Sequence, residues 1–219
     1  MDFNVLCERL RRLDTACLCD ANSGLRVMDP AMRPIRLGLK LIGRAHTVVC
    51  EEDFLTVIKA LRDARPDEVL VVDTHGSRRA VAGELFATEA SRKGLAGIVV
   101  DGAVRDTAKI RGLSIPVYSR TIIPVAGTTR RIFETQVPVH CGGVAVNPGD
   151  ILYGDDDGIV VATEKEFTDL ILVGEAIQGR EEKALVRMGA GESLLSMLNF
   201  DEHYKEIRAN RESALKFLI

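Results

Sequence analysis

The sequence contains no tryptophan, and aromatic residues make up only 5% of its 219 residues. A large aromatic core is therefore excluded. We expect an interior of Val, Ile, Leu and Ala, because 46% of the residues are hydrophobic. This length can bury a sizeable core, so we expect one domain over residues 1–219, with a core over about 15–165 and a helical C-terminal extension over 166–219.

The sequence also lacks a concentration of positive charge. Its formal net charge is −3, and the basic pairs at 11–12, 78–79 and 130–131 are far apart in the chain. Nucleic-acid-binding proteins usually present a basic patch. We therefore expect no nucleic acid partner.

Cysteine is infrequent and does not form a metal-binding pattern. The five cysteines include no C-x-x-C pair, and the C-x-C of Cys17 and Cys19 has no second Cys/His cluster. Buried free thiols in a reducing compartment are expected rather than a zinc site. No stretch has the length of an apolar membrane span, and the first residues are charged. We expect a cytoplasmic protein without a membrane partner.

Hydrophobic periodicity predicts alternating strands and helices in the first half of the chain. Strands are expected over 46–50, 68–74, 95–102 and 115–119, and helices over 3–13, 52–64, 78–94 and 103–112. Residues 132–163 contain short β segments separated by Pro-Gly-Asp and Asp-Asp-Gly turns, and residues 164–219 have helical spacing with a break at 189–191. The order predicts an α/β fold with parallel crossovers, a β-rich second half and a helical tail.

Two predicted strands end in polar residues, in the segments 71–77 and 99–106. Ligands of open α/β sheets bind where strand carboxyl ends meet the following helices. Arg105 presents a planar fork that matches a carboxylate, and Asp106 offers the oxygen ligands that Mg²⁺ and Mn²⁺ prefer. Together they suit a metal-bound keto acid. A solvated salt bridge at a helix start is the alternative interpretation of the same two residues.

Other polar residues have weaker signals. His75 could bind a substrate carboxylate or cap a turn, whereas His46 and His140 are expected to be packed in or beside strands. Asp101 is expected to hold a turn. The acidic run 155–157 lacks the spacing of a calcium-binding loop and predicts a hairpin turn.

The run from Val81 to Asp106, VAGELFATEASRKGLAGIVVDGAVRD, resembles the signature region of the RraA-like family, and NPGDILYGDDDGIVV (147–161) resembles its strand–turn–strand segment. The similarity covers roughly residues 15–195. The family includes metal-dependent class II 4-hydroxy-4-methyl-2-oxoglutarate aldolases and protein regulators of ribonuclease E activity. The resemblance implies a layered α/β/β sandwich of the swivelling β/β/α (phosphohistidine-domain-like) type.

The resemblance also implies roles for individual residues. Asp106 would bind Mg²⁺ or Mn²⁺, and Arg105 would contact the pyruvyl part of an α-keto acid and steady the enolate. The backbone amides around Gly83, Glu84, Leu85 and Phe86 would bind the substrate carboxylate. The side chain of Glu84 stands where the family aldolases have an aspartate that helps to position a metal-bound water.

A second acidic residue would come from the C-terminal tail of a neighbouring subunit. Glu181 is favoured over Glu182, and a solvated helix charge is the alternative for either. The resemblance therefore implies a homotrimer, or a dimer of trimers, with sites between subunits. One departure stands out: the family often has an acidic residue three positions after Arg-Asp, where this chain has Lys109. Either Lys109 faces solvent or the metal site is altered.

We therefore expect a divalent-metal-dependent lyase that cleaves a 4-hydroxy-2-oxo diacid, such as 4-hydroxy-4-methyl-2-oxoglutarate, to pyruvate and a second oxo acid. Oxaloacetate decarboxylation is the expected side activity. The main alternative is a non-enzymatic regulator that binds ribonuclease E or another protein, and a third is a related lyase acting on another small acid. No G-x-G-x-x-G loop follows a strand, so a nucleotide-dependent methyltransferase is not supported.

Overall fold

The computed structural model describes residues 1–218 of the chain. They form two compact units, Met1–Ile171 and a second one that begins at Leu172. No helix within the described residues is both long and apolar enough to cross a membrane.

The first unit is built on a mixed sheet of nine strands among the described residues, in the order β1-β11-β10-β3-β4-β6-β7-β2, with β5 paired to β6. The strands are β1 (Arg26–Val27), β2 (Arg33–Pro34), β3 (Leu41–Val49), β4 (Glu68–Asp73), β5 (Ala80–Ala82), β6 (Gly97–Val104), β7 (Val117–Ile122), β10 (Ile151–Gly154) and β11 (Ile159–Ala162). Strands β3, β4, β6 and β7 are parallel neighbours. Their carboxyl ends therefore share one edge, as the crossover pattern predicted.

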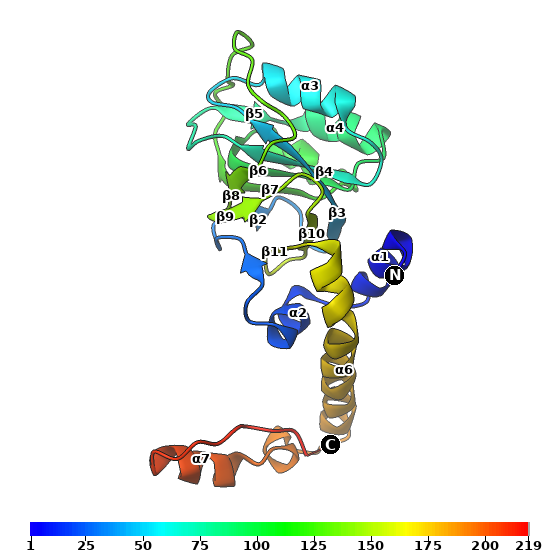
Figure 1. Ribbon diagram of the computed structural model, residues 1–219, viewed down its shortest axis with the longest axis vertical. Coiled ribbons are helices and arrows are strands. Elements are labelled where there is room, and N and C mark those ends of the chain that lie inside the picture. The colour runs from blue at the N-terminus through cyan, green and yellow to red at the C-terminus, as the bar shows by residue number, and fades with distance from the viewer. Residues whose placement is uncertain (219) are drawn as a thin grey trace. The chain divides into compact units, whose positions relative to one another are not determined.

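Helices cover one face of this sheet and a hairpin covers the other (Figure 1). The helical face carries α3 (Leu55–Asp63), α4 (Glu84–Arg92) and α5 (Thr107–Ile110), and the opposite face carries the hairpin of β8 (Val139–Cys141) and β9 (Val144–Val146). Alternate residues of β4 serve the two layers: Leu70 and Val72 pack under the helices, and Val69 and Val71 pack under the hairpin. The core is aliphatic, as the composition predicted.

A third apolar cluster lies at the β10–β11 side of the sheet. It joins α1 (Phe3–Leu10), α2 (Thr15–Ala21) and the first turns of α6 (Glu164–Gly189) to those strands. Phe167 and Ile171 of α6 are fully buried there. The start of α6 is therefore part of the first unit.

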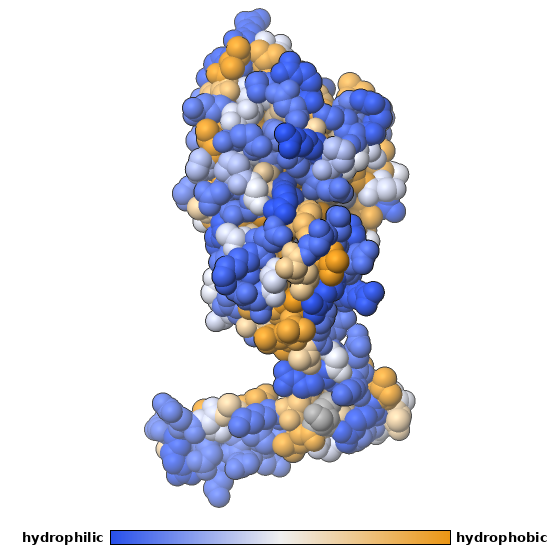
Figure 2. All heavy atoms as spheres, turned by 45° about the vertical axis from the view of Figure 1, so that its right-hand side comes forward, coloured by the Kyte–Doolittle hydropathy of each residue, from blue (hydrophilic) through white to orange (hydrophobic). Residues whose placement is uncertain are grey.

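The second unit contains the rest of α6, a 3₁₀ helix (Leu194–Met197) and α7 (Phe200–Arg208). Gly191 has φ +93° and follows the end of α6, as the predicted break at 189–191 requires. Helix α7 buries none of its residues. Hydrophobic side chains of both units reach the surface in separate groups between polar ones (Figure 2).

Two predicted helices are shorter in the structure. Residues 78–94 were expected to be one helix, but Ala80–Ala82 form β5, which pairs with Ala103 and Val104 of β6. The expected helix 103–112 is reduced to α5, because the same two residues continue β6. Sheet pairing between distant residues overrides the local periodicity. Residues 209–218 are likewise not helical.

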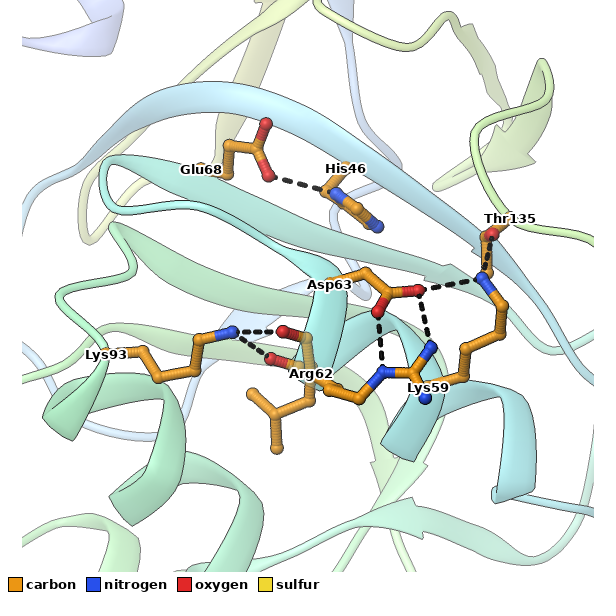
Figure 3. A network of polar contacts seen from close by, with 8 residues as sticks. His46, Lys59, Arg62, Asp63, Glu68, Lys93 and Thr135 are labelled. Atoms are coloured by element: carbon orange, nitrogen blue, oxygen red, sulfur yellow. Dashed lines mark hydrogen bonds and ion pairs between the residues drawn. The ribbon is translucent and has the colours of Figure 1, made fainter.

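The far end of α3 is fixed by polar contacts from neighbouring elements (Figure 3). Lys93, at the end of α4, donates to the carbonyl oxygens of Leu61 and Arg62 at 2.7 and 2.6 Å. The last carbonyl groups of α3 are thus satisfied by a side chain of the adjacent helix.

His46 is buried in β3, as predicted, and its Nδ1 lies 2.9 Å from Glu68 Oε2.

Several polar residues lie elsewhere than expected. Asp101 lies inside β6, and its carboxylate accepts hydrogen bonds from Arg120 and from the amide of Gly142. Gly142 is in the turn between β8 and β9, so Asp101 holds the turn of that hairpin rather than one at the end of its own strand. His140 is in a strand but exposed, because it points out of the β8–β9 hairpin. The acidic run 155–157 does form the β10–β11 turn. All five cysteines are free thiols, and four of them are buried.

Candidate functional site

A cavity of about 140 Å³ lies on the helical face, at the carboxyl edge of the parallel strands. Its lining comes from β5, the start of α4, the end of β6 and two loops: Phe54, Ala80, Val81, Ala82, Gly83, Leu85, Phe86, Arg105, Asp106 and Ala126. The structure therefore brings together the two segments that the sequence singled out, 82–86 and 105–106.

Arg105 and Asp106 are placed by the end of β6. The Arg105 amide donates to the carbonyl oxygen of Ala82 at 3.1 Å, which ties the strand end to β5. Asp106 then takes a left-handed conformation, φ 59° and ψ 30°, and begins α5. The Arg105 Nε and Asp106 Oδ2 atoms lie 3.5 Å apart, and both side chains are about two-fifths exposed. Asp tolerates this backbone better than most residues, but it is still strained.

Gly83 leaves the room that this pair occupies. A Cβ atom on residue 83 would lie 2.6 Å from Asp106 Oδ2 and 3.1 Å from Arg105 Cγ. The φ of Gly83 is −164°, which any residue can adopt, so space rather than backbone conformation makes glycine necessary here.

The first turn of α4 offers backbone donors beside these side chains. The amides of Phe86 and Ala87 already donate to the Gly83 carbonyl oxygen. The amides of Glu84 and Leu85 have no acceptor within residues 1–218, as is typical of a helix start without a side-chain cap. Such donors and the positive end of the helix dipole suit a carboxylate. Of the four predicted amides, the Phe86 amide is therefore already engaged.

The Glu84 carboxylate and Lys109 form an exposed ion pair. Lys109 Nζ lies 2.8 Å from Glu84 Oε2. The hydrogen bond to Glu84 raises the pKa of Lys109, and the charges of Glu84 and Asp106 add to this shift. The lysine that departs from the family pattern is thus in contact with a predicted site residue. The side chains at this site therefore include two cations, Lys109 and Arg105, and two anions, Glu84 and Asp106.

These residues fit a divalent metal that takes one carboxylate ligand from the chain and keeps several waters. No group of three or more His, Cys, Asp or Glu side chains that could hold a metal occurs in the part of the chain that the structure describes. A structural zinc site, which needs four protein ligands, is therefore not supported within one chain. Mg²⁺ keeps several waters and binds through one or two carboxylates. The partly exposed carboxylate of Asp106 at the cavity matches that requirement.

The lining of this cavity does not include the predicted residues Glu84, His75, Glu181 and Glu182. His75 has φ 50°, is exposed, and its Nδ1 lies 3.8 Å from Asp73 Oδ1. Glu181 and Glu182 belong to the part of α6 in the second unit, where Glu182 accepts a hydrogen bond from Gln178. The role of Glu181 or Glu182 in a neighbouring site stays a prediction.

Sequence reasoning missed one wall of the cavity. Ala126 belongs to a loop held by the fully buried Asp53, whose carboxylate accepts from Thr128 Oγ1 and the amide of Arg130, both at 2.6 Å. It also accepts from the Leu55 amide at 2.9 Å, which joins the loop to the start of α3. Hydrogen-bond partners more than seventy residues apart leave no local pattern in the sequence, so this loop could not be assigned to the cavity from the sequence.

Known proteins share this fold and these segments. The family model described as RraA-like, Aldolase/RraA, matches residues 15–161. A putative 4-hydroxy-4-methyl-2-oxoglutarate aldolase of Halalkalibacterium halodurans is 34% identical over 176 residues, which cover 80% of this chain and 84% of that protein.

Two solved structures are similar as well. The RNA-processing inhibitor RraA from Thermus thermophilis has 33% identity and a TM-score of 0.64 over 68% of this chain and 92% of its own. A Geobacillus kaustophilus HTA426 protein described as an S-adenosylmethionine: 2-dimethylmenaquinone methyltransferase has 36% identity and a TM-score of 0.65 over 69% and 95%. The family match spans more than half of the chain and includes both segments that line the cavity, so this mixed α/β protein belongs to the RraA-like family.

Proposed function

We propose that this chain is a carbon–carbon lyase that cleaves a 4-hydroxy-2-oxo diacid to pyruvate and a second oxo acid. One observation carries the proposal: Arg105, Asp106 and the free amides at the start of α4 meet at one cavity. The relative described as a putative 4-hydroxy-4-methyl-2-oxoglutarate aldolase supports it. The substrate class is an α-keto acid with a second carboxylate.

Residues of this chain have separate roles in the proposed reaction. The Glu84 and Leu85 amides bind the substrate's 1-carboxylate, and the Arg105 guanidinium stabilises negative charge that develops on the pyruvyl oxygen as the C3–C4 bond breaks. A preorganised donor of this kind typically contributes about 3–4 kcal/mol to the transition state. Glu84, which is paired with Lys109, orients the water that accepts the 4-hydroxyl proton and then returns a proton to the enolate carbon, which gives pyruvate.

Asp106 is the residue that would hold Mg²⁺ or Mn²⁺. When bound, the metal supplies Lewis-acid polarisation of the 2-oxo group. Oxaloacetate loses carbon dioxide with the same charge developing on its pyruvyl part, so its decarboxylation is a proposed side activity. We also propose that a homotrimer, or a dimer of trimers, completes each site with Glu181 of a neighbouring copy.

The experiment that tests this proposal follows pyruvate. Chelator-treated protein is incubated with oxaloacetate and with 4-hydroxy-4-methyl-2-oxoglutarate, with and without Mg²⁺. We expect Mg²⁺-dependent pyruvate formation, and its loss in Asp106→Asn. Asp67→Asn is the matched control, because Asp67 is another exposed aspartate with positive φ, 64°. Folded protein that gives no pyruvate from either substrate would contradict the proposal.

The regulator remains the second candidate, and the similarity to the Thermus thermophilis RNA-processing inhibitor favours it. In that case the protein binds a ribonuclease and the Arg105–Asp106 pair turns over no keto acid. Two results together would favour this candidate. The unchanged protein would have no lyase activity, and the Asp106→Asn variant would inhibit the ribonuclease as fully as the unchanged protein does.

A further inference from the structure

A second cavity, of about 270 Å³, lies at the edge of the sheet where β2 pairs with β7. It shares no lining residue with the first cavity. Its polar lining comes from two strands and from the end of α5: Arg33, Arg111, Ser119, Arg120 and Thr121. Three arginines and two residues with hydroxyl groups therefore line one small space.

Two of the three arginines carry charge that no carboxylate offsets. Arg33 Nη1 donates to the carbonyl oxygen of Asp157, and Arg111 Nε donates to that of Ile35, each at 3.2 Å. Neither makes an ion pair within residues 1–218. Backbone carbonyls orient a guanidinium without neutralising it, and each arginine keeps further N–H groups for a ligand.

The third arginine is already compensated. Arg120 pairs with Asp101 through Nε and with Asp29 through Nη1, the latter at 3.3 Å. These two carboxylates fix Arg120 against the cavity wall. The three lining arginines and the carboxylates of Asp29 and Asp101 therefore carry one net positive charge, and the guanidinium groups of Arg33 and Arg111 are the two that no carboxylate contacts.

Ser119 adds a hydroxyl group to the lining. The residue is only 4% exposed, lines the cavity, and its hydroxyl makes no hydrogen bond to any residue from 1 to 218. The hydroxyl oxygen is not one of the buried side-chain atoms that lack a partner among the described residues, so it is open to the cavity and can take a partner there. A ligand oxygen in the cavity would supply that partner.

We propose that this cavity binds the phosphate group of a small molecule. A phosphate dianion concentrates two charges and three acceptor oxygens on one centre, and guanidinium forks match such oxygens in pairs. A dicarboxylate instead separates its two charges along a carbon chain. The cavity volume is below the range of about 300–1,000 Å³ typical of drug-sized ligands, which favours a small phosphate compound.

Isothermal titration calorimetry on the full chain tests the proposal at low ionic strength. Inorganic phosphate and glycerol 3-phosphate are titrated separately, so that free phosphate and a phosphate ester are distinguished. We expect at least one of them to bind, and Arg111→Gln to weaken binding about tenfold or more, as the loss of a charge-assisted hydrogen bond requires. Ser119→Ala should weaken it by a smaller factor.

Arg130→Gln is the matched control, since Arg130 is exposed, makes no ion pair among the described residues and lies outside this cavity. It should bind phosphate as the unchanged protein does. Equal weakening by Arg130→Gln, no heat from either phosphate compound, or binding of succinate as tight as that of phosphate would overturn the proposal. So would a single-stranded oligonucleotide that binds more tightly than both. The readout is binding alone, so it is independent of lyase activity.

Discussion

At the scale of single residues, the geometry of the Arg105–Asp106 pair depends on the missing side chain of Gly83. Gly83→Ala places a Cβ 2.6 Å from Asp106 Oδ2. The carboxylate can rotate away, so the fold should persist while the site is displaced. A displacement of about 1 Å can lower turnover by about 10²-fold. We expect a loss of that order in pyruvate formation with little change in melting temperature.

Gly158→Ala is the control for this substitution, because nothing lies within 4 Å of a Cβ at that position. It should leave turnover unchanged. An active Gly83→Ala variant would mean that the position of the Asp106 carboxylate does not matter to the reaction.

Lys109 is the residue that sets the charge of the site. Its ion pair with Glu84 is exposed, so Lys109→Met should hardly change stability. Removing one positive charge beside Glu84 and Asp106 should tighten Mn²⁺ binding by about tenfold, since like charges a few ångströms apart repel each other by about 1–4 kcal/mol. Titration of Mn²⁺ followed by electron paramagnetic resonance measures this without any turnover. Weaker binding would contradict the proposed place of the metal at Asp106.

The sequence predicted some of these residues and not their partners. Arg105, Asp106 and the 82–86 segment could be found because strand ends, a glycine and a helix start have local signatures. The contact between Lys109 and Glu84 could not, because it depends on how α4 and α5 are placed side by side. Resemblance to a family also pointed to Lys109 only as a departure, without showing what it touches.

At the scale of elements, the loop that walls the first cavity depends on Asp53. Burial by itself raises the pKa of Asp53, but its hydrogen bonds, chiefly from the Arg130 amide and the Thr128 hydroxyl, outweigh burial and lower the pKa overall. A lowered pKa in the folded state means that this stabilisation is present above the unfolded-state pKa of about 3.9 and is lost as the pH falls through the folded-state value.

Asp53→Asn should therefore lower the free energy of unfolding by about 2–3 kcal/mol at neutral pH, because N–H donors lose a charged acceptor. It should also reduce the loss of stability below about pH 4. Urea unfolding at both pH values measures the two effects. Asp63 lies at the exposed far end of α3 (Figure 3), the helix that begins after Asp53, and Asp63→Asn should change the free energy of unfolding little at neutral pH. Equal effects of the two substitutions would contradict the anchoring role of Asp53.

The elements themselves were predicted where their periodicity was long and their ends were marked. Helix α3 ends before Pro66, and Gly94 with φ +73° follows α4. The short strand β5 was read as helix because Val81 and Leu85 also fit a helical interval. Its strand conformation comes from pairing with β6, which is a tertiary effect.

At the scale of the whole molecule, the proposed site between subunits can be tested by complementation. Asp106→Asn and Glu181→Gln variants should each be inactive alone. After subunit exchange, some sites combine an intact Asp106 with an intact Glu181 of a neighbouring copy, so pyruvate formation should return. Native mass spectrometry follows the mixed oligomers.

Glu182→Gln is the control in that experiment and should remain active without a partner. Mixed oligomers that stay inactive would show that Glu181 does not act across subunits. Activity lost in Glu182→Gln and kept in Glu181→Gln would assign the role to Glu182 instead.

The sheet ends on both sides in two-residue strands, β1 and β2, and Pro34 of β2 has no N–H to offer another strand. Short edges of this kind discourage the main-chain pairing through which sheets grow from one molecule to the next. In the proposed oligomer we therefore expect copies of this chain to recognise one another through side chains rather than through a shared backbone ladder. We consequently expect that single substitutions on the surface, and not only gross unfolding, would separate the proposed oligomer into its copies.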